Sequence, residues 1–266
     1  MSPAGGPVSP HDLKHILVAI EDQPAFLIGG QALNIWAERY ALTVPELLVF
    51  GPYTSKDVDF IGTRDVACAI AEATGGRLLE PTIDRCTPST AIVEIPVTNG
   101  PGIMWVDFLD GVLGISKPDL DRGTQTIELV YAGGSLRLAL LDPIGCLKSR
   151  WANVYHPALL RRDNNALRQL RASPIVAAAY LDELIDQGAR QDLNRSIRQL
   201  HHWLRRDEIG RKAEQAVVDH GIMDPLDILR RLLDEPRLDS RFRSCQLTWM
   251  VADIEQMRSV ASHMHS

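Results

Sequence analysis

SKDVDFIG, residues 55–62, places two aspartates two positions apart in an apolar run. Alternate residues of a strand point to the same face, so Asp57 and Asp59 are expected to share a face, with Cα atoms about 6.6 Å apart. Two ionised carboxylates at that spacing repel each other unless a cation neutralises them. Their oxygens suit one Mg²⁺ ion, or two ions about 3.5–4 Å apart. The alternative is an exposed edge strand with two solvated aspartates.

A glycine pair, Gly29-Gly30, ends an apolar run earlier in the chain. A helix that begins there would present free N–H groups and a partial positive charge, so the pair predicts a phosphate-binding turn. A strand-to-helix turn that meets no ligand also requires glycine. The sequence holds no Walker A loop and no GxGxxG, HExxH, GxSxG or protein-kinase signature. The acidic residues therefore remain the leading chemical feature.

Asp107 is a third carboxylate of interest, because it lies within WVDFL, residues 105–109, among bulky apolar neighbours. An isolated buried aspartate is unfavourable, so this residue needs a partner or a role. Beside the first two aspartates it would complete a metal cluster and act as general base on an incoming hydroxyl. Weaker candidates for the same place are Asp110 and Glu94.

The composition is that of an ordinary globular protein of 266 residues, 45% hydrophobic and 23% charged. No apolar run reaches about 18 residues, so a transmembrane helix is not expected. The N-terminus lacks the basic and apolar regions of a signal peptide, and the four cysteines form no CxxC pair. We therefore expect a cytoplasmic protein with reduced thiols.

Charge is distributed unevenly along the chain. Residues 1–147 carry a net charge of −9, residues 148–212 of +6 and residues 213–266 of −3. An acidic first part beside a basic middle is typical of a metal-binding half next to an anion-binding half, or of solvated helix faces. Several basic residues of the middle part fall on one helical face, where they would contact an RNA backbone or form an exposed amphipathic surface. They are Arg190, Arg195, Arg198, His201, His202, Arg205 and Arg206.

The hydrophobic periodicity changes near residue 141, where short strands mixed with helices give way to helices only. An N-cap followed by proline, Asp142-Pro143, marks the change. We expect domains at residues 1–141 and 142–266. Strands are predicted at 25–28, 58–61, 90–97, 103–109, 127–131 and 136–140, and helices at 12–20, 31–41 and 65–73, the first capped by Asp12. Later helices are expected to restart at Pro157, Pro174, Asp192, Asp207, Asp224 and Asp239.

The order of these features resembles the nucleotidyltransferase superfamily of the DNA polymerase β type. Its pattern is an apolar strand, a Gly-Gly or Gly-Ser turn into a helix, an Asp-x-Asp strand and a third carboxylate on a later strand. IGGQALNIW (28–36) and SKDVDFIG look most like the AbiEii branch, which includes nucleotidyltransferase toxins of toxin–antitoxin systems. LLDPIGCLKSRWANV (140–154) and LLRRDNNALRQL (159–170) are similar to its Lys helix and Arg-Asp segment. Two departures are a longer spacer between the glycine pair and the Asp-x-Asp strand, and Ala166 in place of an aspartate.

The resemblance implies an α+β fold, with a mixed-sheet nucleotidyltransferase domain followed by an all-helical domain. It implies an enzyme with two Mg²⁺ ions, or Mn²⁺, that moves NMP from an NTP such as ATP or GTP to an acceptor hydroxyl. The acceptor would be RNA, such as a tRNA end, and an antitoxin protein would be a partner. The catalytic and metal-binding residues would be Asp57, Asp59 and Asp107, and the nucleotide-binding residues Gly29, Gly30, Ser55, Lys148 and Arg150.

Two alternatives stay open at this point. One is a nucleotidyltransferase that acts on a small hydroxylated molecule, similar to the aminoglycoside enzymes. The other is a catalytically inactive module of the same fold that binds nucleotide or protein. The cations after the sheet, Lys148 and Arg150, would contact phosphates in an enzyme and would otherwise be ordinary solvent-exposed residues.

Overall fold

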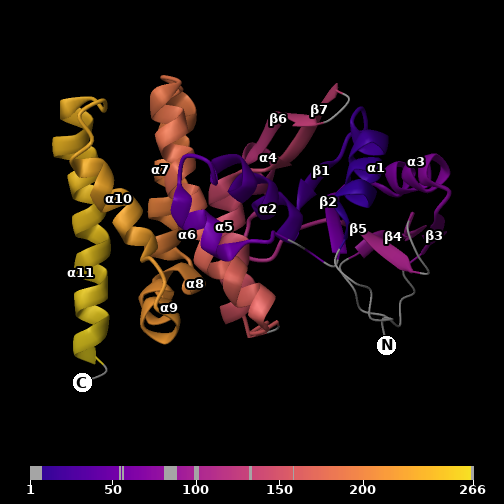
Figure 1. The fold of residues 1–266 in the computed structure, drawn as a ribbon. Coiled ribbons are helices and arrows are strands. Elements are labelled where there is room, and N and C mark those ends of the chain that lie inside the picture. The colour runs from indigo at the N-terminus through magenta and orange to yellow at the C-terminus, as the bar shows by residue number, and fades with distance from the viewer. Residues whose placement is uncertain are drawn as a thin grey trace. The chain divides into compact units, whose positions relative to one another are not determined.

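The computed structural model describes residues 8–53, 55, 57–80, 89–98, 102–131, 134–157 and 159–264, with side chains as far as residue 260 (Figure 1). The chain divides into two compact units. The sheet unit comprises Met1–Arg39 and Gly51–Cys146, and the helical unit comprises Tyr40–Phe50 and Leu147–Ser266. The segment Tyr40–Phe50, which lies between the two parts of the sheet unit in sequence, therefore belongs to the helical unit. The assignment of separate domains to residues 1–141 and 142–266 stays a prediction.

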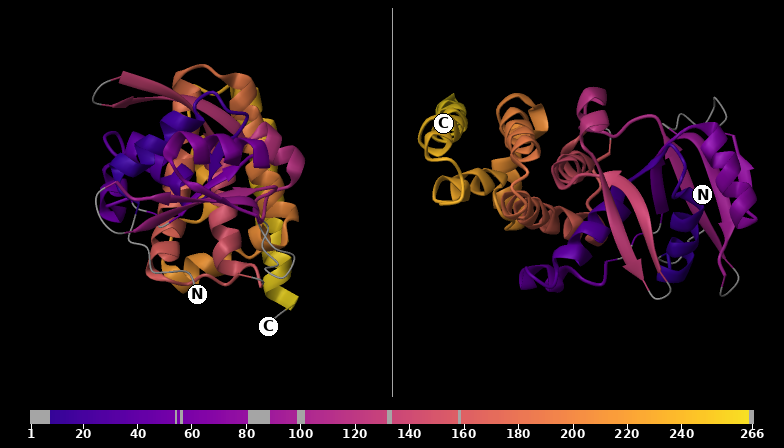
Figure 2. Two further views of the ribbon diagram at one scale, coloured as in Figure 1. Left: turned by 90° about the vertical axis from the view of Figure 1, so that its right-hand side faces the viewer. Right: turned by 90° about the horizontal axis from the view of Figure 1, so that it is seen from above.

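The described part of the sheet unit contains one mixed, seven-stranded sheet in the order β3-β4-β5-β2-β1-β7-β6. Its strands are β1 (Phe26–Ile28), β2 (Asp57–Ile61), β3 (Arg77–Leu79), β4 (Ser89–Pro96), β5 (Ile103–Leu109), β6 (Thr124–Tyr131) and β7 (Gly134–Leu141), and its helices are α1 (Pro10–Ile20), α2 (Gly29–Tyr40), α3 (Arg64–Thr74) and α4 (Lys117–Arg122). β2 is parallel to β5 and β1 to β7, and the other neighbours are antiparallel. The expected hairpin of β6 and β7 is drawn in pink in both views of Figure 2. With the helices that follow, the α+β prediction is confirmed.

The central strands follow the period of two that their sequences predict. Val58 and Phe60 of β2, and Val106 and Phe108 of β5, are 0% exposed. The two phenylalanine rings stack with centroids 5.8 Å apart. α1 and α3 contact each other and also contact the sheet, through β7 and β4 respectively (Figure 1). The alternate residues of β2 and β5, which include the aspartates, therefore point to the opposite face from this core.

The N-cap of α1 corrects one prediction. The helix begins at Pro10, and the hydroxyl of Ser9 accepts a hydrogen bond from the N–H of Asp12 at 3.1 Å. Asp12 is buried in the first turn and accepts hydrogen bonds from the N–H and the hydroxyl of Thr98, at 3.0 and 2.7 Å. Serine before a proline at the first helical position is the better start signal.

The helical unit follows the change predicted near residue 141. The α5 cap is confirmed, since the carboxylate of Asp142 accepts a hydrogen bond from the N–H of Gly145 at 2.7 Å. Helices were expected to restart at Asp207 and Asp224, and these residues are the N-caps of α8 and α10. The elements are η1 (Pro45–Phe50), α5 (Pro143–Tyr155, which begins in the sheet unit), α6 (Asn164–Asp186), α7 (Arg190–Arg206), α8 (Glu208–Arg211), α9 (Ala213–His220), α10 (Pro225–Leu233), the π-helical η3 (Phe242–Leu247) and α11 (Thr248–Met264).

Pro174 corrects a second prediction, because α6 continues through it instead of restarting there. Proline lacks the N–H that would bond to the carbonyl of Leu170, four residues earlier. The hydroxyl of Ser173 donates to that carbonyl at 2.9 Å, so the carbonyl keeps a partner. Pro157 begins no helix either, since α6 starts at Asn164.

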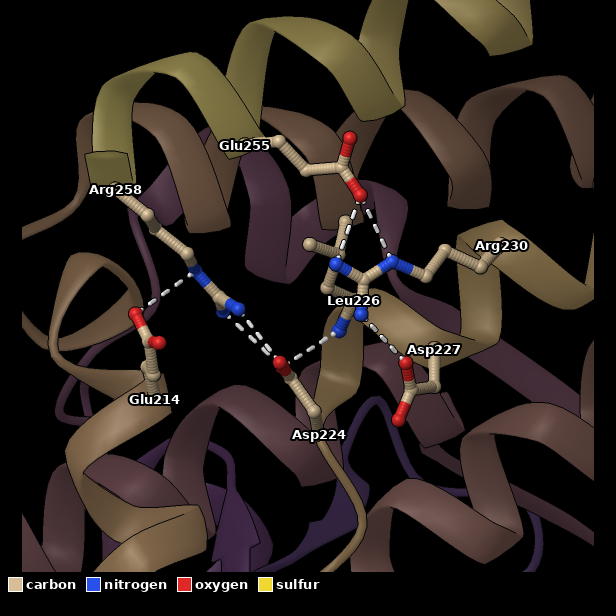
Figure 3. A network of polar contacts seen from close by, with 7 residues as sticks. All are labelled: Glu214, Asp224, Leu226, Asp227, Arg230, Glu255 and Arg258. Carbon is tan, nitrogen blue, oxygen red and sulfur yellow. Dashed lines mark hydrogen bonds and ion pairs between the residues drawn. The ribbon is translucent and has the colours of Figure 1, made fainter. Parts of the chain in front are cut away.

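A network of ion pairs joins α9, α10 and α11 (Figure 3). Its most buried pair is Asp224 with Arg258, whose side chains are 13% and 10% exposed and lie 2.5 Å apart. Asp224 also accepts a hydrogen bond from the N–H of Leu226 at 2.9 Å, so one carboxylate caps α10 and fixes α11. The other members are more exposed: Glu214 pairs with Arg258, and Arg230 pairs with Asp227 and Glu255.

Before residue 141, three short elements of the described chain were not predicted: β3, α4 and η1. Each has at most six residues, too few to show a period in the sequence. Across the described ranges, no helix combines the length and the apolar character that a membrane span needs.

Candidate active site

The two aspartates of β2 lie as the sequence predicts, on the face opposite the apolar core. Asp57 is exposed and Asp59 is partly exposed, while Val58 between them is fully buried. The strand is not an edge strand, because β1 pairs with it on one side and β5 on the other. The alternative of an edge strand is therefore wrong, although Asp57 is exposed as that alternative expected.

β5 brings Asp107 beside this pair. The strands are parallel, and their register pairs Asp59 with Asp107 and Asp57 with Trp105. Paired residues of neighbouring strands point to the same face, with backbones about 4.8 Å apart. Three carboxylates, two from β2 and one from a strand far along the chain, therefore share one small area of the sheet.

Gly29 connects the glycine pair to the same area. It follows β1 directly, and the last residue of that strand, Ile28, pairs with Asp59. Gly29 has a φ of +70°, which favours glycine, and a Cβ atom built on it would lie 2.1 Å from Oδ2 of Asp59. The glycine is thus required twice, by its backbone conformation and by the carboxylate that lies against it. Gly30 continues into the first turn of α2.

The pKa of Asp107 is raised to about 6. Burial is the largest cause, because it disfavours the charged form, and the negative charge of Asp57 acts in the same direction. A hydrogen bond with Ser89 opposes both effects. A carboxylate with a pKa near neutrality is suited to proton transfer.

We expect Asp107→Asn to raise the free energy of unfolding at pH 8 by about 1–3 kcal/mol. The pKa is higher in the folded protein than the reference value of 3.8, so ionisation of Asp107 destabilises the fold progressively as the pH rises from about 4 to about 6. Asparagine removes that cost. Urea unfolding of both proteins with EDTA should show nearly equal stability at pH 4 and a gap that is complete above pH 6. If the variant and the wild type had the same free energy of unfolding at pH 8 as well as at pH 4, the raised pKa of Asp107 would be contradicted.

The side chains are not arranged as a finished metal site. Within the described residues, no group of three or more His, Cys, Asp or Glu side chains stands ready to hold a metal ion. The donor set nevertheless fits a hard cation, since it consists of carboxylates whose mutual repulsion already shifts one pKa. Asp57 and Asp59 are the residues that would hold such an ion, and Asp107 lies beside them in the register of β2 and β5.

Trp105 is a feature of this face that the sequence did not single out. It faces the same side as Asp57, its partner in register, and its indole N–H is buried with no partner among the described residues. The only sequence signal is its position in WVDFL, two residues before Asp107. A donor of this kind beside a carboxylate is available to a polar ligand group.

The remaining predicted residues have separate settings. Ser55 is partly exposed just before β2, and its carbonyl accepts a hydrogen bond from the N–H of Val8 at 2.9 Å. Glu94, a weaker candidate, is bound to Arg77 at 2.5 Å. Asp110 is exposed after the end of β5.

Lys148 and Arg150 belong to the helical unit, whereas the three carboxylates belong to the sheet unit. Lys148 is only 6% exposed and is already engaged in a contact. The guanidinium of Arg150 donates a hydrogen bond to the side-chain oxygen of Gln169 at 2.9 Å. With the side-chain amide of Asn153 flipped, its oxygen also accepts a hydrogen bond from Arg150 at 3.1 Å. Their role toward a nucleotide stays a prediction.

Comparisons with known proteins give little. No family model matches the chain, and no curated protein matches it. A solved structure of an antigenic nucleotidyltransferase-like protein from Paracoccidioides brasiliensis is similar over 72% of this chain and 94% of that chain, with 11% identity and a TM-score of 0.39. Similarity at this level assigns no function.

Proposed function

We propose that this protein is a metal-dependent nucleotidyltransferase that moves NMP from an NTP to an acceptor hydroxyl. One observation carries the proposal: Asp59 lies between Gly29, against which its carboxylate packs, and Asp107, its partner in the register of β2 and β5. A turn suited to phosphates and three carboxylates are thereby joined at one place. Nucleotidyl transfer needs both, because the triphosphate must be held and its charge offset where the acceptor attacks.

Each residue has a role in this proposal. Gly29 and Gly30 seat the triphosphate at the start of α2, where free N–H groups favour anions. Asp57 and Asp59 would hold Mg²⁺ or Mn²⁺, which would offset the charge of the phosphates. Asp107 takes the proton of the acceptor hydroxyl. The acceptor oxygen then forms a bond to the α-phosphorus as the bond to the leaving pyrophosphate breaks.

RNA is the acceptor that we favour. On α7 the exposed side chains of Arg198, His202 and Arg206 recur every four residues, and no ion pair holds them within the described chain. Their neighbours Arg195 and Arg205 are paired, with Asp192 and Asp253 respectively. Two arginines whose charge no ion pair offsets, with a histidine between them that can donate hydrogen bonds, suit a phosphate backbone. A toxin that acts on a tRNA end, with an antitoxin partner, would be one enzyme of this kind.

The test is a label-transfer assay with each of the four NTPs, labelled in the α-phosphate, in the presence of Mg²⁺ and total RNA. A second set of reactions offers aminoglycosides as acceptors in place of RNA. We expect label on RNA. Label on the aminoglycosides but not on RNA would show that the acceptor is a small molecule. Nucleotide binding without any transfer would favour the inactive module.

We expect the triple variant Arg198→Gln, His202→Gln, Arg206→Gln to weaken RNA labelling at least about tenfold at physiological salt, since each lost phosphate contact weakens binding. Arg211→Gln with Arg241→Gln removes two exposed arginines elsewhere in the helical unit and serves as a control. The apparent KM for RNA is the measurement. Equal losses in both variants would show a general effect of charge and remove α7 as the RNA surface.

A further inference from the structure

The pairing of β4 with β5 contains an irregularity close to the acidic residues. Ala91 is opposite Phe108, but Ser89 rather than Thr90 is opposite Leu109. Thr90 is therefore an extra residue on β4, in the manner of a β-bulge. Bulges occur often beside active sites, where they redirect a side chain.

The side chain of Thr90 holds this irregularity in place. Its hydroxyl lies 3.0 Å from the carbonyl oxygen of Phe108 and 3.3 Å from that of Gly62. The first belongs to β5 and the second to the residue directly after β2. One hydroxyl therefore ties the bulge to both strands that carry the aspartates.

The bulge decides which face Ser89 occupies. In a regular ladder Thr90 would be opposite Leu109, and Ser89 would point to the apolar face of the sheet. With one residue inserted, Ser89 lies opposite Leu109 of β5. Leu109 and Asp107 are two residues apart on β5 and share a face, so Ser89 points to the face of Asp107. Its hydroxyl makes a hydrogen bond with the Asp107 carboxylate.

We propose that Ser89 is a positioning residue, directed by the bulge at Thr90 to hold the carboxylate of Asp107 in place for proton transfer. A hydroxyl that donates to one carboxylate oxygen fixes the rotation of the group and leaves the other oxygen for the acceptor hydroxyl. The role rests on the proposed function, because it serves the base of that reaction. The sequence did not reveal it, since a strand pattern does not show where a residue is inserted.

The test compares Ser89→Ala with Ser89→Thr, which keeps the hydroxyl. We expect Ser89→Ala to lower kcat on the order of tenfold or more with the KM for NTP nearly unchanged, because a hydrogen bond to a charged group at the reacting centre is lost. Ser89→Thr should recover most of kcat. Ser135→Ala, a change at an exposed serine of β7, controls for loss of a strand serine.

Thr90→Val tests the bulge itself, since it keeps the shape of the side chain and removes the hydroxyl that contacts the carbonyls of Phe108 and Gly62. It should lower kcat in the same way, and Thr90→Ser should not. An active wild type whose kcat is unchanged by Ser89→Ala and Thr90→Val overturns the role of Ser89 alone. A wild type that transfers no nucleotide overturns the proposed function and this role together.

Discussion

Replacing Gly29 with alanine should lower nucleotidyl transfer by about 100-fold or more and leave the protein folded. The new Cβ atom would lie 2.1 Å from Oδ2 of Asp59 and 3.1 Å from its Cγ, so the carboxylate must rotate away. Rotation relieves the clash with the carboxylate, and the Cβ atom of Asp59, 3.2 Å away, has to shift by only a few tenths of an ångström, so the cost in stability is small. The rotation nevertheless removes the Asp59 carboxylate from the place where phosphate charge has to be offset. Initial rates of label transfer and thermal unfolding together measure the two effects.

Gly75→Ala is a matched control for this substitution. Gly75 has a φ of +65°, close to that of Gly29, and a Cβ atom there would meet nothing within 4 Å. Both variants should lose about 1–2 kcal/mol from the left-handed backbone alone, and only Gly29→Ala should lose activity. Equal activity in the two variants would show that the contact between Gly29 and Asp59 has no part in function.

Asp57→Asn and Asp59→Asn should each lower transfer by about 100- to 1,000-fold. Asparagine keeps the shape and an oxygen ligand but removes the negative charge that attracts a divalent cation. Asp57→Asn should also lower the pKa of Asp107, because the charge of Asp57 contributes to raising it. Transfer rates measured over a range of Mg²⁺ concentrations should show weaker activation by the metal in both variants.

Asp110→Asn is the control for these charge removals, since Asp110 follows β5 and is exposed. It should keep the activity of the wild type. If all three variants were equally active, the aspartates of β2 would have no part in metal binding and the proposed enzyme would be wrong.

The sequence predicted the acidic face well, for a local reason. Alternation of apolar and polar residues fixes which side of a strand each residue occupies, so Asp57, Asp59 and Asp107 could be placed from their neighbours. The pairing of Asp59 with Asp107 could not be predicted in this way, because the register of two strands depends on contacts between segments far apart in sequence.

Other features were missed because their causes are not local. The inserted Thr90 is stabilised by carbonyls of two other segments, and Pro174 is accommodated by a serine hydroxyl beside it. The long spacer between Gly30 and β2 is a third such feature. Part of it, Tyr40–Phe50, belongs to the helical unit, where the hydroxyl of Tyr40 donates to Glu183 at 2.5 Å. The glycine pair still meets the Asp-x-Asp strand through Gly29.

The central claim is that Gly29 and the three carboxylates form one nucleotide site. A crystal structure with a non-hydrolysable NTP analogue and Mn²⁺, located by its anomalous scattering, tests it most directly. We predict a Mn²⁺ ion about 2 Å from oxygens of Asp57 and Asp59, with the triphosphate at the N–H groups of Gly29 and Gly30. A nucleotide bound elsewhere, or a metal ion without contact to Asp59, would contradict the claim.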